Sequence, residues 1–173
     1  KTRPRVNVQL QYNLTNRVYA DVLASAIDVG IVACPTTKTG IEIIPFASEN
    51  MVIVASPDHP FAKREIVNLK ELSTYPFVTF SDDIPTRHLI DTKLWQAGAR
   101  VEILNKYDNI ETIKNIVEIG NGLSILPESS VELEVREGTL KVIPVVPKEQ
   151  FVRPTAIILK MNRTRRAAVV EFV

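Results

Sequence analysis

The chain has few side chains that could act as a nucleophile or bind a transition metal. Its 173 residues include one cysteine, Cys34, and two histidines, His59 and His88. A usual zinc site takes four ligands, which these residues could supply only with help from several carboxylates. Cys34 could serve as a nucleophile only if His59 or His88 acted as its base. Because Cys34 ends the apolar run "DVGIVAC", we interpret it as a small buried side chain, and we predict no metal and no cofactor.

Arg87 is the best-placed cation for binding a ligand. It follows "SDDIP" and lies in the first turn of a helix that Pro85 is expected to begin. A guanidinium there, beside free helix N–H groups, could hold a carboxylate. The alternative is an internal ion pair with one of the nearby carboxylates, which are Asp82, Asp83 and Asp91.

Asn13 and Thr15 come just before or at another expected helix start, in "NLTNRVYADVLASAI". They could cap that helix, or they could donate hydrogen bonds to a ligand. The chain has no glycine-rich phosphate loop, no G-x-S-x-G and no H-E-x-x-H, which removes the usual support for nucleotide binding or hydrolysis.

Hydrophobic spacing predicts strands and helices that alternate along the chain, as in an α/β sheet whose ligands bind at the carboxyl ends of strands. The run "DVGIVAC" is expected to be a strand buried on both faces beside the first strand. Residues 41–47 and 51–56 are expected to form a hairpin or one bent strand. Trp95 is expected in the core. The other expected strands are 5–11, 77–80, 100–104, 123–126, 139–145 and 155–160, and the expected helices are 15–27, 68–76, 85–98, 109–119, 127–135 and 163–173.

The stretch "DNIETIKNIVEIGNGLSILPE" predicts a helix, a corner and a strand in succession. Asp108 and Glu111 have the spacing of a capping box, so the helix should begin near Asn109. Gly120 and Gly122 tolerate positive φ and should end the helix before the strand begins.

Composition excludes several classes of protein. Hydrophobic residues make up 45% of the chain and charged residues 24%, which is typical of a folded globular protein. The formal net charge is +1 and no run of Lys or Arg exceeds two, so this chain lacks the charge pattern of a nucleic-acid-binding face. No apolar run approaches the ~18 residues of a membrane span, and we expect a cytoplasmic protein.

Several motifs occurring in one order resemble the effector-binding domain of LysR-type transcriptional regulators. They are "AIDVGIVA", "PDHPFA", "PTRHLIDTKLWQAG" and "IVEIGNGLSILP", and the similarity covers almost the whole chain. The resemblance implies an α/β fold of the type II periplasmic-binding-protein kind, with two Rossmann-like lobes joined by two crossing strands. It also implies a small ligand in the cleft between the lobes.

The resemblance implies that lobe I comprises residues 1–50 plus 155–173 and that lobe II comprises 51–154. In members of this family, the position matching "RPRVNVQL" is preceded by a strand and a helix of lobe I. Before these come a winged helix-turn-helix domain and its linker helix. Those elements are not in this sequence, so lobe I is expected to be incomplete at its N-terminus, and contact with DNA is expected only through the missing domain.

Residues matching the ligand-binding loops of the family are expected to contact the effector. In lobe I they are Asn13, Thr15, Ala33, Cys34 and Pro35. In lobe II they are Thr79, Phe80, Ser81, Asn109, Ile110, Leu126 and Pro127, with Arg87 added on chemical grounds.

The resulting hypothesis is a non-catalytic sensing domain of a bacterial regulator. It would bind a small polar or anionic metabolite, form a homodimer or homotetramer, and have no contact with membranes. One alternative is the solute-binding protein of a transporter, which has the same fold. Another is an enzyme on this scaffold, for which Cys34, Asp82, Asp83 and Arg87 are the candidate catalytic residues.

Overall fold

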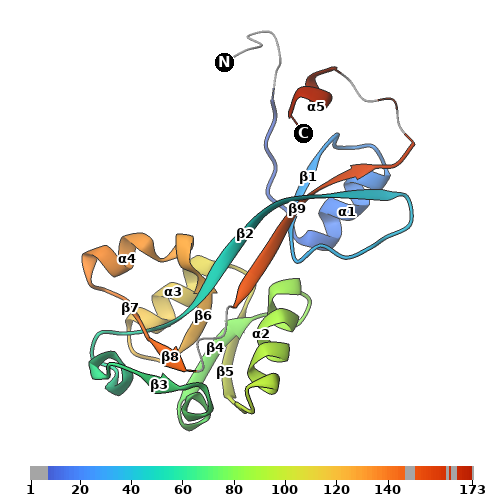
Figure 1. Ribbon diagram of the computed structural model, residues 1–173. Coiled ribbons are helices and arrows are strands. Elements are labelled where there is room, and N and C mark those ends of the chain that lie inside the picture. Colours follow the sequence, from blue (N-terminus) through green and yellow to red (C-terminus); the bar gives the residue numbers. More distant parts are fainter. Residues whose placement is uncertain (1–7, 147–150, 163, 165–166, 173) are drawn as a thin grey trace. The chain divides into compact units, whose positions relative to one another are not determined.

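The chain forms two compact units. The computed structural model describes residues 8–146, 151–162, 164 and 167–172. One unit contains residues 1–47 and 154–173, and the other contains residues 48–153 (Figure 1). Two strands continue from one unit into the other, β2 (Ile41–Ala55) and β9 (Val152–Lys160). Residues 41–47 and 51–56 are therefore parts of one continuous strand, which was one of the two expected possibilities. The identity of the units as regulatory lobes stays a prediction.

Unit 1 is a small sheet with one helix packed on it. Strand β1 (Gly30–Ala33) runs antiparallel to β9, with Gly30 opposite Ile158 and Ala33 opposite Thr155, and β9 lies beside β2. Helix α1 (Thr15–Leu23) approaches β1 so closely that a Cβ on Gly30 would lie 2.7 Å from Val18 Cγ1. The unit also contains α5 (Ala167–Phe172). The buried core consists of Tyr19, Val22, Val32, Ile41 and Ile158.

Two expectations for unit 1 are wrong. The described part of the expected first strand, residues 8–11, forms no strand, and Val8 and Leu10 are 70% and 79% exposed. Residues 5–7 lie outside the described residues. The run "DVGIVAC" is not buried on both faces, since Ile31 is 49% exposed. Its strand, β1, pairs with β9 and not with the described part of the expected first strand. Hydrophobic alternation alone could not show that residues 8–11 have no partner strand among the described residues.

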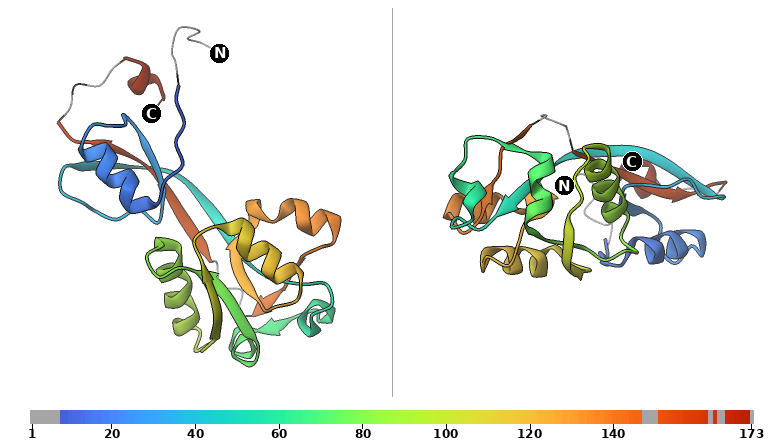
Figure 2. Two further views of the ribbon diagram at one scale, coloured as in Figure 1. Left: turned by 180° about the vertical axis from the view of Figure 1, so that it is seen from behind. Right: turned by 90° about the horizontal axis from the view of Figure 1, so that it is seen from below.

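Unit 2 is built on a mixed sheet. Strand β4 (Pro76–Phe80) runs parallel to β5 (Glu102–Tyr107), and it meets the β6 segment at a parallel bridge between Phe77 and Leu123. Strand β6 (Ser124–Pro127) is antiparallel to the second half of β2, with Met51 opposite Pro127, and β7 (Lys141–Val142) also pairs with β2. A short parallel pair joins β3 (Val67–Asn68) to β8 (Val145–Val146). Figure 2 shows these strands from behind and from below.

Helices α2 (Pro85–Gln96) and α3 (Ile110–Glu118) both pack against β4. The remaining helical segments are α4 (Glu132–Glu137) and three 3-10 turns, η1 (Pro60–Lys63), η2 (Leu69–Thr74) and η3 (Glu128–Ser130). The largest fully buried side chains of unit 2 include Leu72, Phe77, Leu94, Ile113, Leu123 and Ile125. No helix among the described residues is both long and apolar enough to cross a membrane.

Local signals predicted the starts of α2 and α3 to within one residue. The helix expected over 127–135 is wrong, because that range contains η3 and only the first part of α4, which begins at Glu132. The side chain of Asn68 caps η2 and Glu71 completes the capping box, and α3 begins directly after Asn109. The cap of α3 is Asn109 rather than Asp108, since Asn109 Oδ1 accepts a hydrogen bond from Thr112 N at 2.8 Å. Trp95 is 76% exposed and not in the core, because the buried face of α2 is formed by Ile90 and Leu94.

Candidate functional site

The carboxyl ends of three parallel strands meet at one edge of unit 2. Strands β4, β5 and β6 end at Phe80, Tyr107 and Pro127. Ser81 N donates to Tyr107 O at 2.8 Å, which ties the loop after β4 to the end of β5. Open α/β sheets bind ligands at this edge, so the loops that follow these strands form the candidate site of unit 2.

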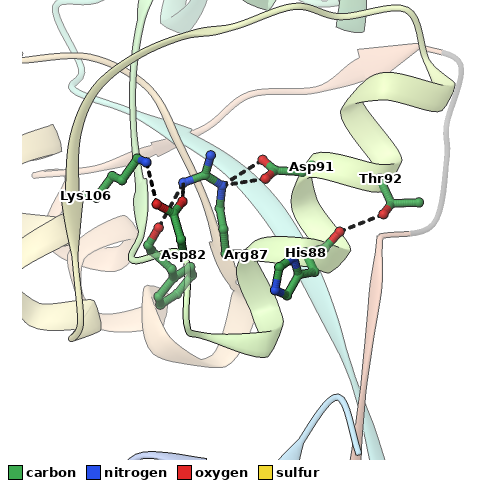
Figure 3. Close-up of polar contacts among 7 residues, drawn as sticks. Asp82, Arg87, His88, Asp91, Thr92 and Lys106 are labelled. Carbon is green, nitrogen blue, oxygen red and sulfur yellow. Dashed lines mark hydrogen bonds and ion pairs between the residues drawn. The ribbon is translucent and has the colours of Figure 1, made fainter. Parts of the chain in front are cut away.

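Arg87 organises the loop that follows β4 (Figure 3). Its side chain is only 9% exposed, and its Nε donates to both carboxylate oxygens of Asp91, at 2.7 and 2.8 Å. Its Nη1 donates to the carbonyl oxygen of Phe80 at 3.1 Å and forms an ion pair with Asp82 at 3.2 Å. The guanidinium therefore joins the end of β4, the loop and α2. Of the two roles considered for Arg87, an internal ion pair or a contact to the carboxylate of a ligand, the structure shows the internal ion pair.

Asp82 extends this network to β5. Lys106 Nζ lies 2.6 Å from Asp82 Oδ2. The hydrogen bond from Lys106, reinforced by the positive charges of Lys106 and Arg87, lowers the pKa of the Asp82 carboxyl. Asp82 thus remains ionised between two cations. Both cations are therefore paired with a carboxylate.

The expected contact residues of unit 2 differ in exposure. Ser81 and Ile110 are half-buried, and Asn109 is exposed while its side chain caps α3. The side chains of Phe80 and Pro127 are buried, and those of Thr79 and Leu126 are fully buried. Thr79 Oγ1 has no hydrogen-bond partner among the described residues, and the same holds for Ser124 Oγ on β6. Of the expected contact residues of unit 2, Ser81, Asn109 and Ile110 are therefore the ones that are at least partly exposed.

The start of α1 is the corresponding feature of unit 1. Thr15 is the first residue of the helix and is half-buried, while Asn13 is exposed in the preceding segment. The N-cap position is occupied by Leu14, and no side-chain cap is formed within the described residues. The capping role that Asn13 or Thr15 could have had is therefore not observed. An uncapped helix start leaves backbone N–H groups available to an anionic or polar group.

Ala33, Cys34 and Pro35 lie at the end of β1 and in the loop that follows. Cys34 has φ of 48°, an unusual value for a residue other than glycine, and its N–H donates to Pro154 O at 2.7 Å. All three side chains are half-buried. Unit 1 thus carries its expected contact residues on the loop after β1 and at the start of α1.

The sequence and fold can now be compared with known proteins. The family described as the LysR substrate binding domain matches residues 1–173. This chain belongs to the LysR substrate-binding domain family. A probable RuBisCO transcriptional regulator from Trichormus variabilis is 29% identical over 175 residues, covering 98% of this chain and 52% of the relative. The chain spans about half the length of the curated relatives it matches.

Solved LysR-type domains confirm the fold. The regulatory domain of CcmR from Synechocystis PCC6803, solved in complex with 2-PG, has a TM-score of 0.87 at 18% identity, covering 99% of this chain and 82% of that chain. The effector-binding domain of QuiR, solved in complex with shikimate, has a TM-score of 0.82 at 22% identity, covering 92% of this chain and 75% of that chain. The expected periplasmic-binding-protein-like α/β fold is therefore correct for this LysR-type domain.

Some features of the LysR-type domain had no signal in its sequence. Lys106 pairs with Asp82 from a strand 24 residues further along the chain, and no spacing rule links them. The pairing of Arg87 with Asp91 was foreseeable, because residues four apart are neighbours on a helix. Among the described residues, no group of three or more His, Cys, Asp or Glu side chains is placed to hold a metal ion.

Proposed function

We propose that this LysR-type domain senses a small polar or anionic metabolite for a transcriptional regulator. The observation that carries the proposal is the match of the whole chain to the LysR substrate-binding family together with its fold. The relatives are named as transcriptional regulators, and related folds have been solved with 2-PG and with shikimate bound. Both of those compounds carry a carboxylate, which favours an anionic effector here.

The two units would contribute different contacts. In unit 1, the uncapped start of α1 offers backbone N–H groups, and Thr15 adds a hydroxyl at the same place. In unit 2, Ser81 and the first residues of α3 offer hydrogen bonds, whereas Arg87 remains bound to Asp82 and Asp91. We therefore propose that the start of α1 binds anionic groups and that the loop edge of unit 2 binds neutral polar groups.

Effector binding would regulate transcription by shifting a conformational equilibrium. A ligand that binds one state of the domain more tightly moves the population toward that state, by no more than the difference in its two affinities. We propose that the complete regulator acts in the cytoplasm as a homodimer or homotetramer, and that it contacts DNA through a separate domain.

We further propose that the domain is not an enzyme. Asp82 and Arg87, two of the candidate catalytic residues, are paired with each other and hold a loop in place. The relatives named as regulators also disfavour the solute-binding alternative.

Thermal unfolding of the purified protein with 2-PG, shikimate and a panel of small carboxylates and phosphates tests the proposal. A true effector should raise Tm in a saturable manner, since a ligand at 100 times its Kd adds about 2.7 kcal/mol to the free energy of unfolding. Calorimetric titration should then show at least tenfold weaker binding to Thr15→Val. Thr92→Val, which removes an exposed hydroxyl bonded to His88 O, is the matched control. Unchanged affinity in Thr15→Val would exclude Thr15 from the site.

A further inference from the structure

The hydroxyl group of Tyr19 connects α1 to the loop that follows β1. Tyr19 lies in the second turn of α1 and its side chain is 1% exposed. Its hydroxyl oxygen accepts a hydrogen bond from Thr36 N at 2.9 Å, and the same hydroxyl donates to Thr36 O at 3.0 Å. Both backbone polar groups of Thr36 are thus satisfied by one side chain from a different element.

Further contacts hold the two ends of this loop. At its start, Cys34 N donates to Pro154 O at 2.7 Å. At its end, Ile41 N donates to Lys38 O at 3.1 Å, and Lys38 Nζ lies 4.4 Å from the centroid of the Tyr19 ring. Between these two ends, Thr36 in the middle of the loop is hydrogen-bonded to the hydroxyl of Tyr19. The hydroxyl therefore determines where residues 34–38 lie relative to α1.

Core packing requires the ring of Tyr19 but not its hydroxyl. The ring packs in the cluster formed with Val22, Val32, Ile41 and Ile158. A phenylalanine would fill almost the same space, and burying a hydroxyl is costly unless it is hydrogen-bonded. Among the described residues, the hydrogen bonds of this hydroxyl both involve Thr36, so its contribution is to the loop.

We propose that Tyr19 is a positioning residue for effector binding: its hydroxyl holds the 34–38 loop, which contains Cys34 and Pro35, against α1, the helix that begins at Thr15. This inference rests on the proposed function, because it assigns Tyr19 a role in ordering that binding edge before the effector arrives. A preordered loop binds more tightly, since its conformational entropy is not lost on binding.

The test compares Tyr19→Phe with the wild type and uses Cys34 as a reporter. Cys34 is the single cysteine of the chain, so alkylation by iodoacetamide, followed by intact mass, measures one site. Tyr19→Phe should increase the alkylation rate about tenfold, because two hydrogen bonds to the loop are lost. Hydrogen exchange at the Thr36 amide should accelerate by a similar factor, while exchange at Val32, which is paired with β9, should remain unchanged.

The matched control is Tyr12→Phe, which removes the hydroxyl of a side chain that is 93% exposed and should leave both rates as in the wild type. Wild-type rates in Tyr19→Phe would overturn the proposal. Equal acceleration at Thr36 and Val32 would also overturn it, because the hydroxyl would then stabilise the unit as a whole. Neither alkylation nor hydrogen exchange requires an effector. Failure of this proposal can therefore be distinguished from failure of the proposed function, which the thermal-shift test with 2-PG and shikimate examines.

Discussion

Arg87 Nη1 donates a hydrogen bond to the carbonyl oxygen of Phe80 at 3.1 Å, from the first turn of α2 to the last residue of β4. This bond satisfies a carbonyl group at the point where the strand ends, and the same guanidinium binds Asp91 in the next turn of the helix. The strand, its loop and the following helix are therefore held by one side chain whose charge is already neutralised.

Replacing Arg87 with methionine should destabilise unit 2 by about 2 kcal/mol. The change leaves Phe80 O without this donor and leaves Asp82 and Asp91 without their shared cation, and hydrogen bonds to charged groups contribute about 1.5–3 kcal/mol each. Urea denaturation followed by circular dichroism measures the effect. Arg100→Met, which changes an exposed arginine, is the control, and equal stability of the two variants would contradict the role given to Arg87.

Replacing Gly122 with alanine should destabilise the protein more than the same change at Gly138. Both residues have positive φ, of 128° and 80°, which costs an alanine about 1–3 kcal/mol. At Gly122 the new Cβ would also lie 2.7 Å from the carbonyl oxygen of Pro76, whereas at Gly138 nothing lies within 4 Å. The difference between the two variants in urea denaturation reports the steric clash with β4 together with the less favourable φ of Gly122. Equal losses would show that the backbone conformation alone determines the cost.

Glu49 should contribute to stability at neutral pH and lose that contribution in acid. Burial raises the pKa of Glu49, but the hydrogen bonds and charge of Arg153 outweigh it and hold the pKa below its ordinary value. A lowered folded-state pKa means that the stabilisation is present above the unfolded value, about 4.3, and is lost as pH falls through the folded value.

Glu49→Gln should therefore be less stable than wild type at pH 7, by about 1 kcal/mol for this half-buried pair, and the gap should narrow as pH falls below the unfolded value of about 4.3. Urea denaturation at a series of pH values from 7 downward measures the gap. Glu132→Gln, at an exposed position on α4, should show no such gap at any of these pH values. A gap at Glu49 that is independent of pH would mean that packing, and not charge, is responsible.

His59 should make the protein less stable in mild acid. It packs between the rings of Phe61 and Tyr75, and its Nδ1 accepts a hydrogen bond from Phe61 N at 3.1 Å. Burial lowers the pKa of His59, so the unfolded chain takes up the proton more readily. Stability is then fully present above the unfolded value of about 6.5 and falls as pH drops from there toward the folded value.

The free energy of unfolding measured from pH 7.5 to 5 should decline in the wild type and decline less in His59→Asn, which retains an acceptor for Phe61 N. His88→Asn is the control, because His88 is exposed, and it should keep the wild-type slope. Parallel slopes for wild type and His59→Asn would assign the decline to other groups.

The sequence predicted what depends on near neighbours along the chain. The start of α2 at Pro85, the start of α3 next to Asn109 and the glycine corner at Gly120 and Gly122 all involve residues within a few positions of each other. Because these signals are local, no knowledge of tertiary structure was needed to find them.

Expectations failed where the outcome depends on distant residues. Ile31 is exposed although it lies in an apolar run, because such a run does not reveal which of its faces will be covered, and β1 pairs with β9, more than 120 residues away. The same holds for the site: Thr15, Ser81 and Asn109 could be proposed from motifs, but Lys106 and the hydroxyl contacts of Tyr19 depend on how elements pack. Pattern reasoning could therefore propose the loops of a candidate site but not the contacts that hold those loops.

The exposure of Trp95 determines what fluorescence can report about this protein. It is the only tryptophan of the chain and lies on the outer face of α2, 76% exposed. Its indole is already hydrated in the folded state, so its emission wavelength should change little on unfolding. The same exposure makes it a sensitive probe of any surface that covers α2, since covering would shift its emission toward the blue.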